Sequence, residues 1–470
     1  MDTKALRQKI LDLAIHGKLV PQDPNDEPAS VLLERIRAEK ERLIKEGKIK
    51  KGKKSAKTSD KPHYPYELPK GWEWTTVEEI CSKIGSGSTP KGSNYSQEGV
   101  PFFRSQNVYN HGLVFADIKY ISHEVHQLMI GTEVIANDLL LNITGGSLGR
   151  CAIVPDNFDK GNVSQHVCIL RTIFVKPKYL HSFILSSFFA KNMKITGSGR
   201  EGLPKYNLAK MLLPLPPLQE QQRIIEKVEK LQTFVDEIEN GAKKLSEIIS
   251  KVKSKVLDLA IHGKLVPQDP NDEPASELLK RINPKAEIIS DNGHYQKLPS
   301  GWTVCRLNAI SKIVTGTTPS KSNKGYYGGN FPFYKPTDLD AGRHVSNATE
   351  YLSEKGKEVS RVVPKGTTAI CCIGTIGKVG YLMSEGATNQ QINSAIPSKV
   401  VDSVFLYYLC TSPLFNDKLN SKSSAVTISI VNKSKMEAIL VPLPPLEEQK
   451  RIVSKVEEIF AQLDAIETAL

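Results

Sequence analysis

The stretch LDLAIHGKLVPQDPNDEPAS at residues 11–30 returns letter for letter at residues 257–276. An identical internal repeat marks a structural unit that the chain builds twice. The same landmarks follow each copy in the same order: LPKGWEW at 68 and LPSGWTV at 298, SKIGSGSTP at 82 and SKIVTGTTP at 311, VPFFRSQNV at 100 and FPFYKPTDL at 331, GSLGR at 146 and GTIGK at 374, LPLPPLQEQQRI at 213 and VPLPPLEEQKRI at 441. The sequence therefore predicts two copies of one plan.

A long amphipathic helix is predicted after each proline-rich landmark. Apolar residues step by four and three, which is the spacing of a coiled-coil seam. The expected seam residues are Ile224, Val228, Leu231, Val235, Ile238, Leu245, Ile249 and Val252 in the central copy, and Ile452, Val456, Ile459, Leu463 and Ile466 in the C-terminal copy. The C-terminal helix is shorter, and the segment at the N-terminus supplies the missing turns. We expect the central repeat to be divided between the two chain ends.

These observations give a fold class and a domain plan. We expect an α+β protein in which two similar globular α+β domains are separated by two long antiparallel coiled-coil helices in a circular, pseudo-twofold arrangement. The expected segments are 1–45 (N-terminal helical segment), 46–67 (Lys-rich linker), 68–215 (first globular domain), 216–292 (central helical region), 298–443 (second globular domain) and 444–470 (C-terminal helix).

The composition favours a polyanionic partner. Lys and Arg number 63 against 51 Asp and Glu, which gives a formal net charge of +12 in 470 residues. Such an excess favours nucleic acid. The seven cysteines form no C-x-x-C pair and no long apolar segment is present, so we expect a cytoplasmic protein without a membrane span.

The motifs of common enzymes are missing. The glycines of GTIGK at 374 do not have P-loop spacing, and no Asn or Asp precedes Pro-Pro-aromatic as in amino-methyltransferases. His123 and His126 lie at i and i+3 without a third ligand at a matching distance, so we interpret them as surface polar residues rather than zinc ligands. We therefore expect no active site, no metal and no cofactor in this chain.

The positive charge is concentrated in the globular segments. Residues 68–215 contain 15 Lys or Arg against 11 acids, residues 298–443 contain 16 against 9, and the helix at 216–256 contains 8 against 7. This division favours globular domains that contact phosphates and helices that contact protein. The segment 45–61 adds eight lysines and is interpreted either as a solvated linker or as a non-specific DNA contact.

Matching loops in the two copies carry groups suited to base edges and phosphates. The candidate DNA-binding residues are Thr89, Lys91, Arg104, Gln106, Asn107, Arg150, Gln165, His166, Arg200 and Lys205 in the first copy, and Thr318, Lys321, Lys335, Thr337, Asp338, Lys378, Gln390, Gln391, Lys422 and Lys433 in the second. Arg104-Ser-Gln-Asn in one copy corresponds to Lys335-Pro-Thr-Asp in the other. Two related surfaces would therefore present different groups and recognise unlike half-sequences. A gapped, asymmetric double-stranded DNA target is predicted.

Together these residues resemble a known family, the specificity subunits of Type I restriction-modification systems. The resemblance is carried by the duplicated halves, by LPxGW at 68–72 and 298–302, by the G-x-T-P turns at 87–90 and 316–319, and by the proline-rich helix starts at 213 and 441. It implies two target recognition domains, with helices that set the spacer and dock two methyltransferase subunits. It also implies restriction/translocase subunits, with S-adenosylmethionine, ATP and Mg on those partners.

Two other classes of function stay open at this point. A coiled-coil adaptor explains the heptads but leaves the duplicated basic loops unexplained. A methyltransferase or nuclease with divergent motifs would bind S-adenosylmethionine by itself. Within the resembled family, a specificity subunit for a methylation-only assembly is a further alternative.

Overall fold

The computed structural model describes residues 2–49, 64–196, 202–289, 298–422 and 430–469. The chain divides into two compact units, residues 1–241 (unit 1) and residues 242–470 (unit 2). Helix α8 (Leu218–Ile261) contributes its first part to unit 1 and its second part to unit 2. Each unit is described by itself.

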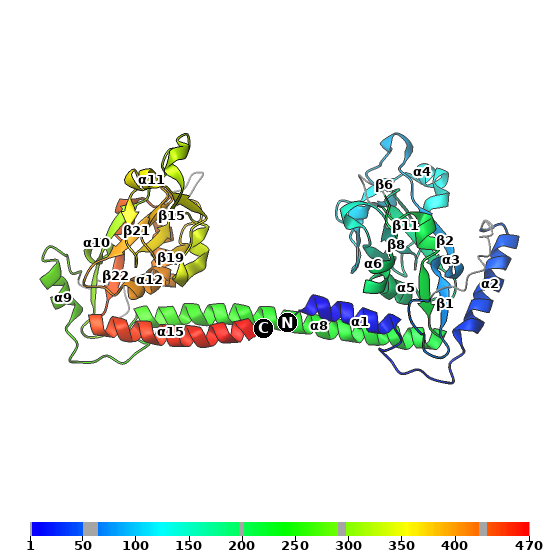
Figure 1. Cartoon of the computed structure of the whole chain (residues 1–470), viewed down its shortest axis with the longest axis horizontal. Coiled ribbons are helices and arrows are strands. Elements are labelled where there is room, and N and C mark those ends of the chain that lie inside the picture. Colours follow the sequence, from blue (N-terminus) through cyan, green and yellow to red (C-terminus); the bar gives the residue numbers. More distant parts are fainter. Residues whose placement is uncertain (1, 50–63, 197–201, 290–297, 423–429, 470) are drawn as a thin grey trace. The chain divides into compact units, whose positions relative to one another are not determined.

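Unit 1 combines helices with two main sheets (Figure 1). Besides the first part of α8, its helices are α1 (Thr3–Ile15), α2 (Ala29–Lys45), α3 (Val77–Ile80), α4 (His123–Leu128), α5 (Pro177–Ile184), α6 (Ser187–Asn192) and α7 (Lys205–Ala209). Its strands are β1 (Glu73–Thr76), β2 (Cys81–Ser86), β3 (Val100–Phe103), β4 (Val108–Tyr109), β5 (Gly112–Leu113), β6 (Lys119–Ile121), β7 (Glu133–Val134), β8 (Leu139–Asn142), β9 (Cys151–Ile153), β10 (Gly161–Val163), β11 (Val167–Thr172) and β12 (Leu212–Leu215). The sheet orders are β2-β11-β8-β9 and β6-β3-β10-β7.

Unit 2 repeats the two main sheets and the two-stranded ribbon of unit 1, but its described strands include no counterpart of the β4–β5 pair. Its helices are α9 (Ala275–Ile282), α10 (Leu307–Ile310), α11 (Glu354–Glu358), α12 (Ser403–Thr411), α13 (Pro413–Ser421), α14 (Lys433–Glu437) and α15 (Leu446–Ala469). Its strands are β13 (Thr303–Arg306), β14 (Ser311–Thr315), β15 (Tyr327–Tyr334), β16 (Glu350–Leu352), β17 (Val362–Val363), β18 (Thr368–Cys371), β19 (Val379–Tyr381), β20 (Gly386–Thr388), β21 (Ile392–Pro397) and β22 (Leu440–Leu443). The orders β14-β21-β18-β19 and β16-β15-β20-β17 match those of unit 1.

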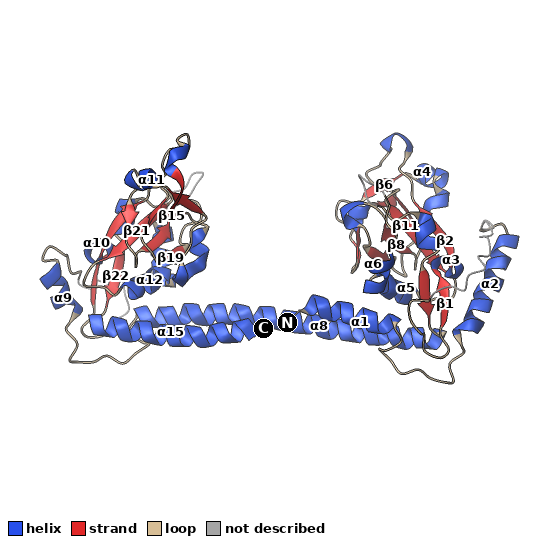
Figure 2. Ribbon diagram, in the orientation of Figure 1, coloured by secondary structure: helices blue, strands red, loops and turns tan. Residues whose placement is uncertain are grey.

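Each globular domain begins and ends at one antiparallel ribbon. In unit 1, β1 pairs with β12, so that Glu73 lies opposite Leu215. In unit 2, β13 pairs with β22, so that Thr303 lies opposite Leu443. The ribbon brings the entry and exit of the domain together, directly before the prolines that precede the helix. The mixed helix and sheet content of both units confirms the predicted α+β class (Figure 2).

A joint of matched residues fastens each domain to its helix. In unit 1, Glu220 of α8 accepts hydrogen bonds from Trp72 Nε1 at 3.0 Å and from Gln22 Nε2 at 3.1 Å. In unit 2, Glu448 of α15 accepts from Trp302 and Gln268 at the same two distances. Burial raises the pKa of both carboxyl groups. The glutamine of this joint comes from the identical repeat, the glutamate from the proline-rich helix start and the tryptophan from LPxGW. These three sequence motifs therefore recur together because they build the same contact in each unit.

The repeat also contains one position that only glycine can occupy. Gly17 and Gly263 both have φ +65°, and a Cβ there would lie 2.3 Å from a proline ring carbon of the LPxGW segment, at Pro69 or Pro299. Both the left-handed backbone and the close approach exclude a larger residue. Gly17 and Gly263 therefore fix the direction in which the chain leaves the helix and let it pack closely against the LPxGW segment.

The long helix packs antiparallel against a different helix in each unit. In unit 1, Arg7 of α1 donates to Gln232 at 2.7 Å and forms ion pairs with Asp236 at 2.6 Å and Glu239 at 2.9 Å. In unit 2, Lys253 of α8 forms an ion pair with Asp464 of α15 at 2.5 Å. The two chain ends thus each cover one part of α8, as the divided repeat predicted.

The predicted seam is buried over most but not all of its length. The buried members are Ile224, Val228, Val235, Ile249, Ile452 and Val456, and the half-buried members are Leu231, Leu245, Ile459 and Leu463. The expectation of burial is wrong at Ile238, Val252 and Ile466, which are 42%, 39% and 47% exposed. Helix α1 begins at Thr3, whose side chain forms a hydrogen bond with Glu239. Ile238 therefore lies beside the first residue of α1, where the packing of α1 against α8 begins.

Candidate DNA interface

Four loops converge at one end of the unit-1 sheets. The turn after β2 is joined to the β10–β11 loop by Ser88 N donating to Val163 O at 3.1 Å. Ser164 N donates to Phe103 O at 2.9 Å, at the start of the loop after β3. Asn142 Nδ2 donates to Ser105 O at 2.9 Å, which connects that loop to the β8–β9 loop. These bonds make one continuous loop surface.

The same loops converge in unit 2. Thr317 N donates to Thr388 O at 2.9 Å and Asn389 N donates to Tyr334 O at 3.2 Å. Cys372 N donates to Gln391 O at 2.8 Å and closes the cluster. We refer to the two clusters as the loop surfaces of unit 1 and unit 2. They place together the predicted residues at 89, 104–107, 150 and 165–166, and those at 318, 335–338, 378 and 390–391.

A threonine–glutamine contact lies in each loop surface. Thr89 Oγ1 donates to Gln165 Oε1, and Thr318 Oγ1 donates to Gln390 Oε1, with all four residues exposed. Because the amide oxygen of each glutamine is used in this way, its amide nitrogen is the group left for a ligand. A base-edge or phosphate acceptor is a suitable partner for such a donor.

Close backbone packing fixes the G-x-T-P turns that hold these threonines. A Cβ on Gly87 would lie 1.8 Å from Val163 O, and one on Gly316 would lie 2.1 Å from Asn389 O. These distances leave no room for a side chain. The glycines therefore let the turn lie directly on the neighbouring loop.

Two predicted base-contacting residues turn out to be structural. Asn107 is fully buried, accepts from Arg104 N at 3.1 Å and donates to Val114 O and Ala116 O. Asp338, at the matching position, accepts from Lys335 N at 2.7 Å and Thr349 N at 2.9 Å. Their polar atoms hold the loop itself, which leaves these two side chains little capacity for the DNA contact that the sequence predicted.

The residues that these turns present remain different in the two units. Gln106 and Thr337 are exposed. Arg104 is half-buried and donates to Asp117 O at 2.9 Å, while its buried Nε has no hydrogen-bond partner within the described chain. Lys335 forms an ion pair with Glu350 at 2.8 Å. A phosphate or base acceptor near Arg104 would satisfy a donor that the protein leaves unpaired.

The remaining loop residues are partly engaged with their neighbours. The Arg150 guanidinium lies 4.9 Å from the centre of the Tyr109 ring, and Lys378 forms an ion pair with Asp340 at 2.6 Å. His166 Nδ1 contacts Thr144 Oγ1 at 2.8 Å. Gln391 accepts from Asn389 Nδ2 at 2.9 Å. Ligand binding would have to compete with or reuse these contacts.

Five of the lysines predicted to bind DNA lie outside the contacts described so far. Lys91 and Lys321 are exposed one and two residues after their G-x-T-P turns, and Lys422 is exposed at the end of α13. Lys205 and Lys433 begin α7 and α14, where each lines a hollow next to the sheet. Arg200 lies outside the described residues, as does most of the Lys-rich segment 45–61.

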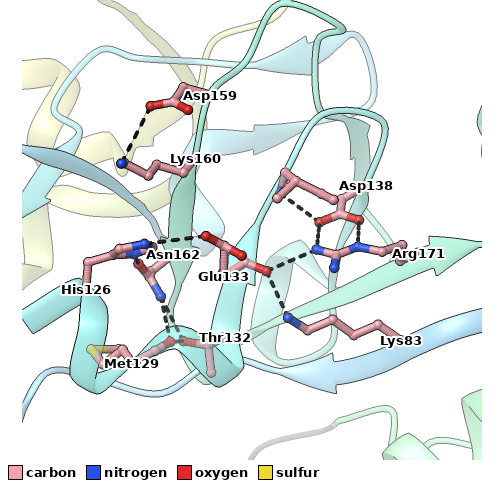
Figure 3. A network of polar contacts seen from close by, with 11 residues as sticks. Lys83, His126, Met129, Thr132, Glu133, Asp138, Asp159, Lys160, Asn162 and Arg171 are labelled. Atoms are coloured by element: carbon pink, nitrogen blue, oxygen red, sulfur yellow. Dashed lines mark hydrogen bonds and ion pairs between the residues drawn. The ribbon is translucent and has the colours of Figure 1, made fainter. Parts of the chain in front are cut away.

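A buried polar network in unit 1 was missed from the sequence (Figure 3). His126, interpreted above as a surface residue, is 1% exposed, and its Nδ1 lies 2.6 Å from Asn162 Oδ1. Arg171 donates to both oxygens of Asp138 at 2.7 and 2.8 Å. The surface interpretation of His126 was wrong because a short helix turns it toward β10, which local sequence does not reveal.

The described residues show neither a metal centre nor a membrane span. No group of His, Cys, Asp or Glu within these ranges is arranged to hold a metal ion. None of the helices described here combines the length and apolar run that a bilayer crossing requires.

A repeated sheet domain with exposed polar loops, mounted on paired helices, defines a class of duplicated recognition proteins. The family described as Type I restriction modification DNA specificity domain matches residues 69–248 and 299–470. This chain belongs to that family, which confirms the resemblance found in the sequence.

Curated relatives and solved structures agree with this assignment. The Type I restriction enzyme EcoAI specificity subunit of Escherichia coli is 33% identical, over 97% of this chain and 89% of the relative. The EcoEI specificity subunit of Escherichia coli is 26% identical, over 99% and 90%. The HsdS subunit from Thermoanaerobacter tengcongensis has the same fold, with a TM-score of 0.53 at 22% identity over 86% of this chain and 93% of that chain. A chain from a structure of a type I R-M system gives a TM-score of 0.58 at 21% identity, over 86% and 94%.

Proposed function

We propose that this chain is the DNA specificity subunit of a Type I restriction-modification complex. Each domain recognises one half of a bipartite, gapped, asymmetric duplex, and the chain itself performs no catalysis. The observation that carries the proposal is the duplicated loop surface, in which the threonine–glutamine contact is the same and the neighbouring exposed residues differ. Equal scaffolds with unequal exposed groups suit a two-part target.

The helices have the properties of a docking element for partner subunits. Phe234 and Ile238, four residues apart on the first part of α8, are 45% and 42% exposed. Ile248 and Val252, four apart on the second part, are 54% and 39% exposed. Apolar pairs at this spacing form a stripe that another protein can cover. In this proposal the stripes receive two methyltransferase subunits, and restriction/translocase subunits complete the assembly.

The chemistry of the complex then belongs to the partners. The methyltransferase subunits supply S-adenosylmethionine and adenine methylation, and the restriction subunits supply ATP and Mg-dependent steps. This chain chooses the sequence at which they act, and such an assembly works in the cytoplasm. A methylation-only assembly would use the same chain without restriction subunits.

Methylome sequencing of host DNA tests the proposal. Cells that contain the partner subunits are compared with and without this chain. We expect adenine methylation at one gapped, asymmetric motif to disappear when the chain is removed. Unchanged methylation at every motif, with the partners expressed, would overturn the proposal and favour an adaptor role.

A further inference from the structure

A basic hollow lies beside the loop surface of unit 1. It has a volume of about 720 Å³ and is bounded by α2, β2 and the start of α7. We call it the unit-1 hollow. Two acids, Glu78 and Glu133, line it together with five cations, which are Lys40, Lys48, Lys83, Arg171 and Lys205. Charge of one sign in a concave site raises the local concentration of the opposite ion.

Two of these cations lie directly opposite each other across paired strands. Lys83 of β2 is the register partner of Arg171 of β11. Like charges at such a position destabilise a sheet. Arg171 is compensated by Asp138, but Lys83 donates to the backbone oxygen of Glu133 at 2.8 Å (Figure 3). The fold therefore tolerates a repulsion in which Lys83, among the described residues, forms no ion pair with a carboxylate.

Two further ammonium groups are in the same condition. Lys40 of α2 donates to the backbone oxygen of Glu78, and Lys205 is exposed at the first residue of α7. Burial lowers the pKa of Lys40 and of Lys83, because desolvation disfavours the charged ammonium form. An anion in the hollow would relieve this cost.

Unit 2 has a hollow at the matching place with much less charge. It measures about 440 Å³ and is lined by Lys312 and Lys433, which correspond to Lys83 and Lys205. The strand partner of Lys312 is Ile396 rather than an arginine, and Lys433 lies 3.5 Å from Glu437. The site is thus duplicated in place, but its positive charge is built up only in unit 1.

We propose that the unit-1 hollow binds a phosphate group and that, in the working complex, this phosphate belongs to the DNA backbone. The proposal rests on the DNA-binding function proposed above and adds a contact outside the loop surface. Lys40, Lys83 and Lys205 hold the phosphate through charge-assisted hydrogen bonds. This contact adds affinity for any sequence, while the loop surfaces supply selectivity.

The position of the hollow supports a backbone phosphate. Strand β2, which forms one wall, leads directly into the G-x-T-P turn at 87–90. The segment before α7 is tied to the β8–β9 loop, because Leu203 N donates to Ile143 O at 2.8 Å.

The test measures how DNA affinity depends on salt. The full chain, assembled with its methyltransferase subunits, is titrated against its target duplex and an unrelated duplex at several salt concentrations. The variants are Lys205→Gln and the double variant Lys40→Gln/Lys205→Gln. The matched control is Lys178→Gln, which removes the same charge from an exposed ion pair with Glu229 on another face. A second arm measures whether inorganic phosphate raises the Tm at constant ionic strength.

We expect each lost contact to lower the slope of log K against log salt by about 0.9, with equal weakening on both duplexes. The control should leave the slope unchanged. An unchanged slope together with a phosphate-dependent Tm that Lys205→Gln abolishes would keep the phosphate site and overturn its assignment to DNA. No change in either arm would overturn the site.

Failure of the proposed function gives a different result. In that case the wild-type complex would show no preference for any target duplex, while the slopes on unrelated DNA still report on the hollow. Lys205 is exposed at the first residue of α7, so we expect the Lys205→Gln variant to fold. This single variant keeps the test valid if the double variant does not fold.

Discussion

Units 1 and 2 have the same strand order in their main sheets, the same closing ribbon and the same joint to their helices, yet the exposed groups of their loop surfaces and the charges of their hollows differ. Trp72 with Glu220 and Trp302 with Glu448 have equal distances. By contrast, Gln106 is matched by Thr337, and the five-cation hollow is matched by one with two lysines. The comparison teaches that the contacts that hold the framework are shared by the two units, whereas the groups that we propose to contact DNA differ between them.

The pair Asn107 and Asp338 shows where this boundary runs. The residues differ chemically, but each accepts a hydrogen bond from the backbone nitrogen three residues before it. They therefore belong to the framework although they lie in a variable loop. A difference in sequence between the units is not by itself a difference in recognition.

The largest expected effect comes from exchanging one unit's domain. Replacing residues 298–443 by the matching domain of a relative exchanges the whole β13–β22 ribbon together with Trp302, and leaves Gln268 and Glu448 of the joint in place. We expect one half of the methylated motif to change and the other half to stay, as read by methylome sequencing. A change in both halves would contradict independent domains.

Removing the tryptophan of the joint should lower the free energy of unfolding more in unit 1 than in unit 2. Trp72 is 5% exposed, whereas Trp302 is half-buried. We expect Trp72→Ala to cost about 3–5 kcal/mol and Trp302→Ala less, because less area is lost. Scanning calorimetry of the full chain measures both. Trp72→Phe is the control that removes mainly the bond to Glu220, and equal losses for the two alanine variants would contradict the asymmetry.

The G-x-T-P turn should be equally intolerant in both units. Gly87→Ala and Gly316→Ala each force a Cβ into a backbone oxygen, at a cost of about 1–3 kcal/mol or a loosened turn. We expect binding to the target duplex, measured by fluorescence anisotropy, to fall at least about tenfold. Gly85→Ala is the matched control, since nothing lies within 4 Å of its added Cβ. Normal binding by Gly87→Ala would refute the close packing.

Exchanging the two framework residues tests whether their shared role is local. Asn107→Asp removes two donations to carbonyl oxygens, and Asp338→Asn places an amide against a backbone donor. We expect each to cost about 1–3 kcal/mol through unsatisfied buried groups. Urea unfolding measures the loss, and DNA affinity should fall with it. Selective loss at one base, with stability intact, would instead restore the base-contact assignment.

The smallest expected effect is a pH dependence in unit 2 alone. Lys418 of α13 has its pKa lowered by burial to about 8, from an ordinary value of 10.5, and Asn192 stands at the matching place in unit 1. Between these values the unfolded chain binds more protons than the folded one, so stability should rise as pH increases above 8. The gain should stay below about 1 kcal/mol because solvent screens a half-buried group.

Thermal unfolding between about pH 7.5 and about pH 9.5, around the lowered pKa of Lys418 and below the range in which tyrosines titrate, measures this effect. Lys418→Met should remove the rise in the unit-2 transition and leave unit 1 unchanged. A rise that persists in the variant would assign the pH dependence to other groups.

The sequence alone determined the duplication, the α+β class, the helices and most of the loops that form the two surfaces. It could do so because LDLAIHGKLVPQ, LPxGW and the proline-rich helix starts are local patterns whose spacing fixes the order of elements. The same reasoning named Thr89 and Gln165, with their counterparts Thr318 and Gln390, on corresponding loops of the two copies, and the structure then showed the contact within each pair.

Only the tertiary structure decided which of the polar residues are buried and which are exposed. Asn107, Asp338 and His126 have the composition of surface residues, but long-range packing buries them. Lys83 and Arg171 are 88 positions apart in the sequence, and only the strand register sets them side by side. The physical reason is that burial and cross-strand contact depend on which distant segments pack together, whereas repeats and helix periodicity are written in neighbouring residues.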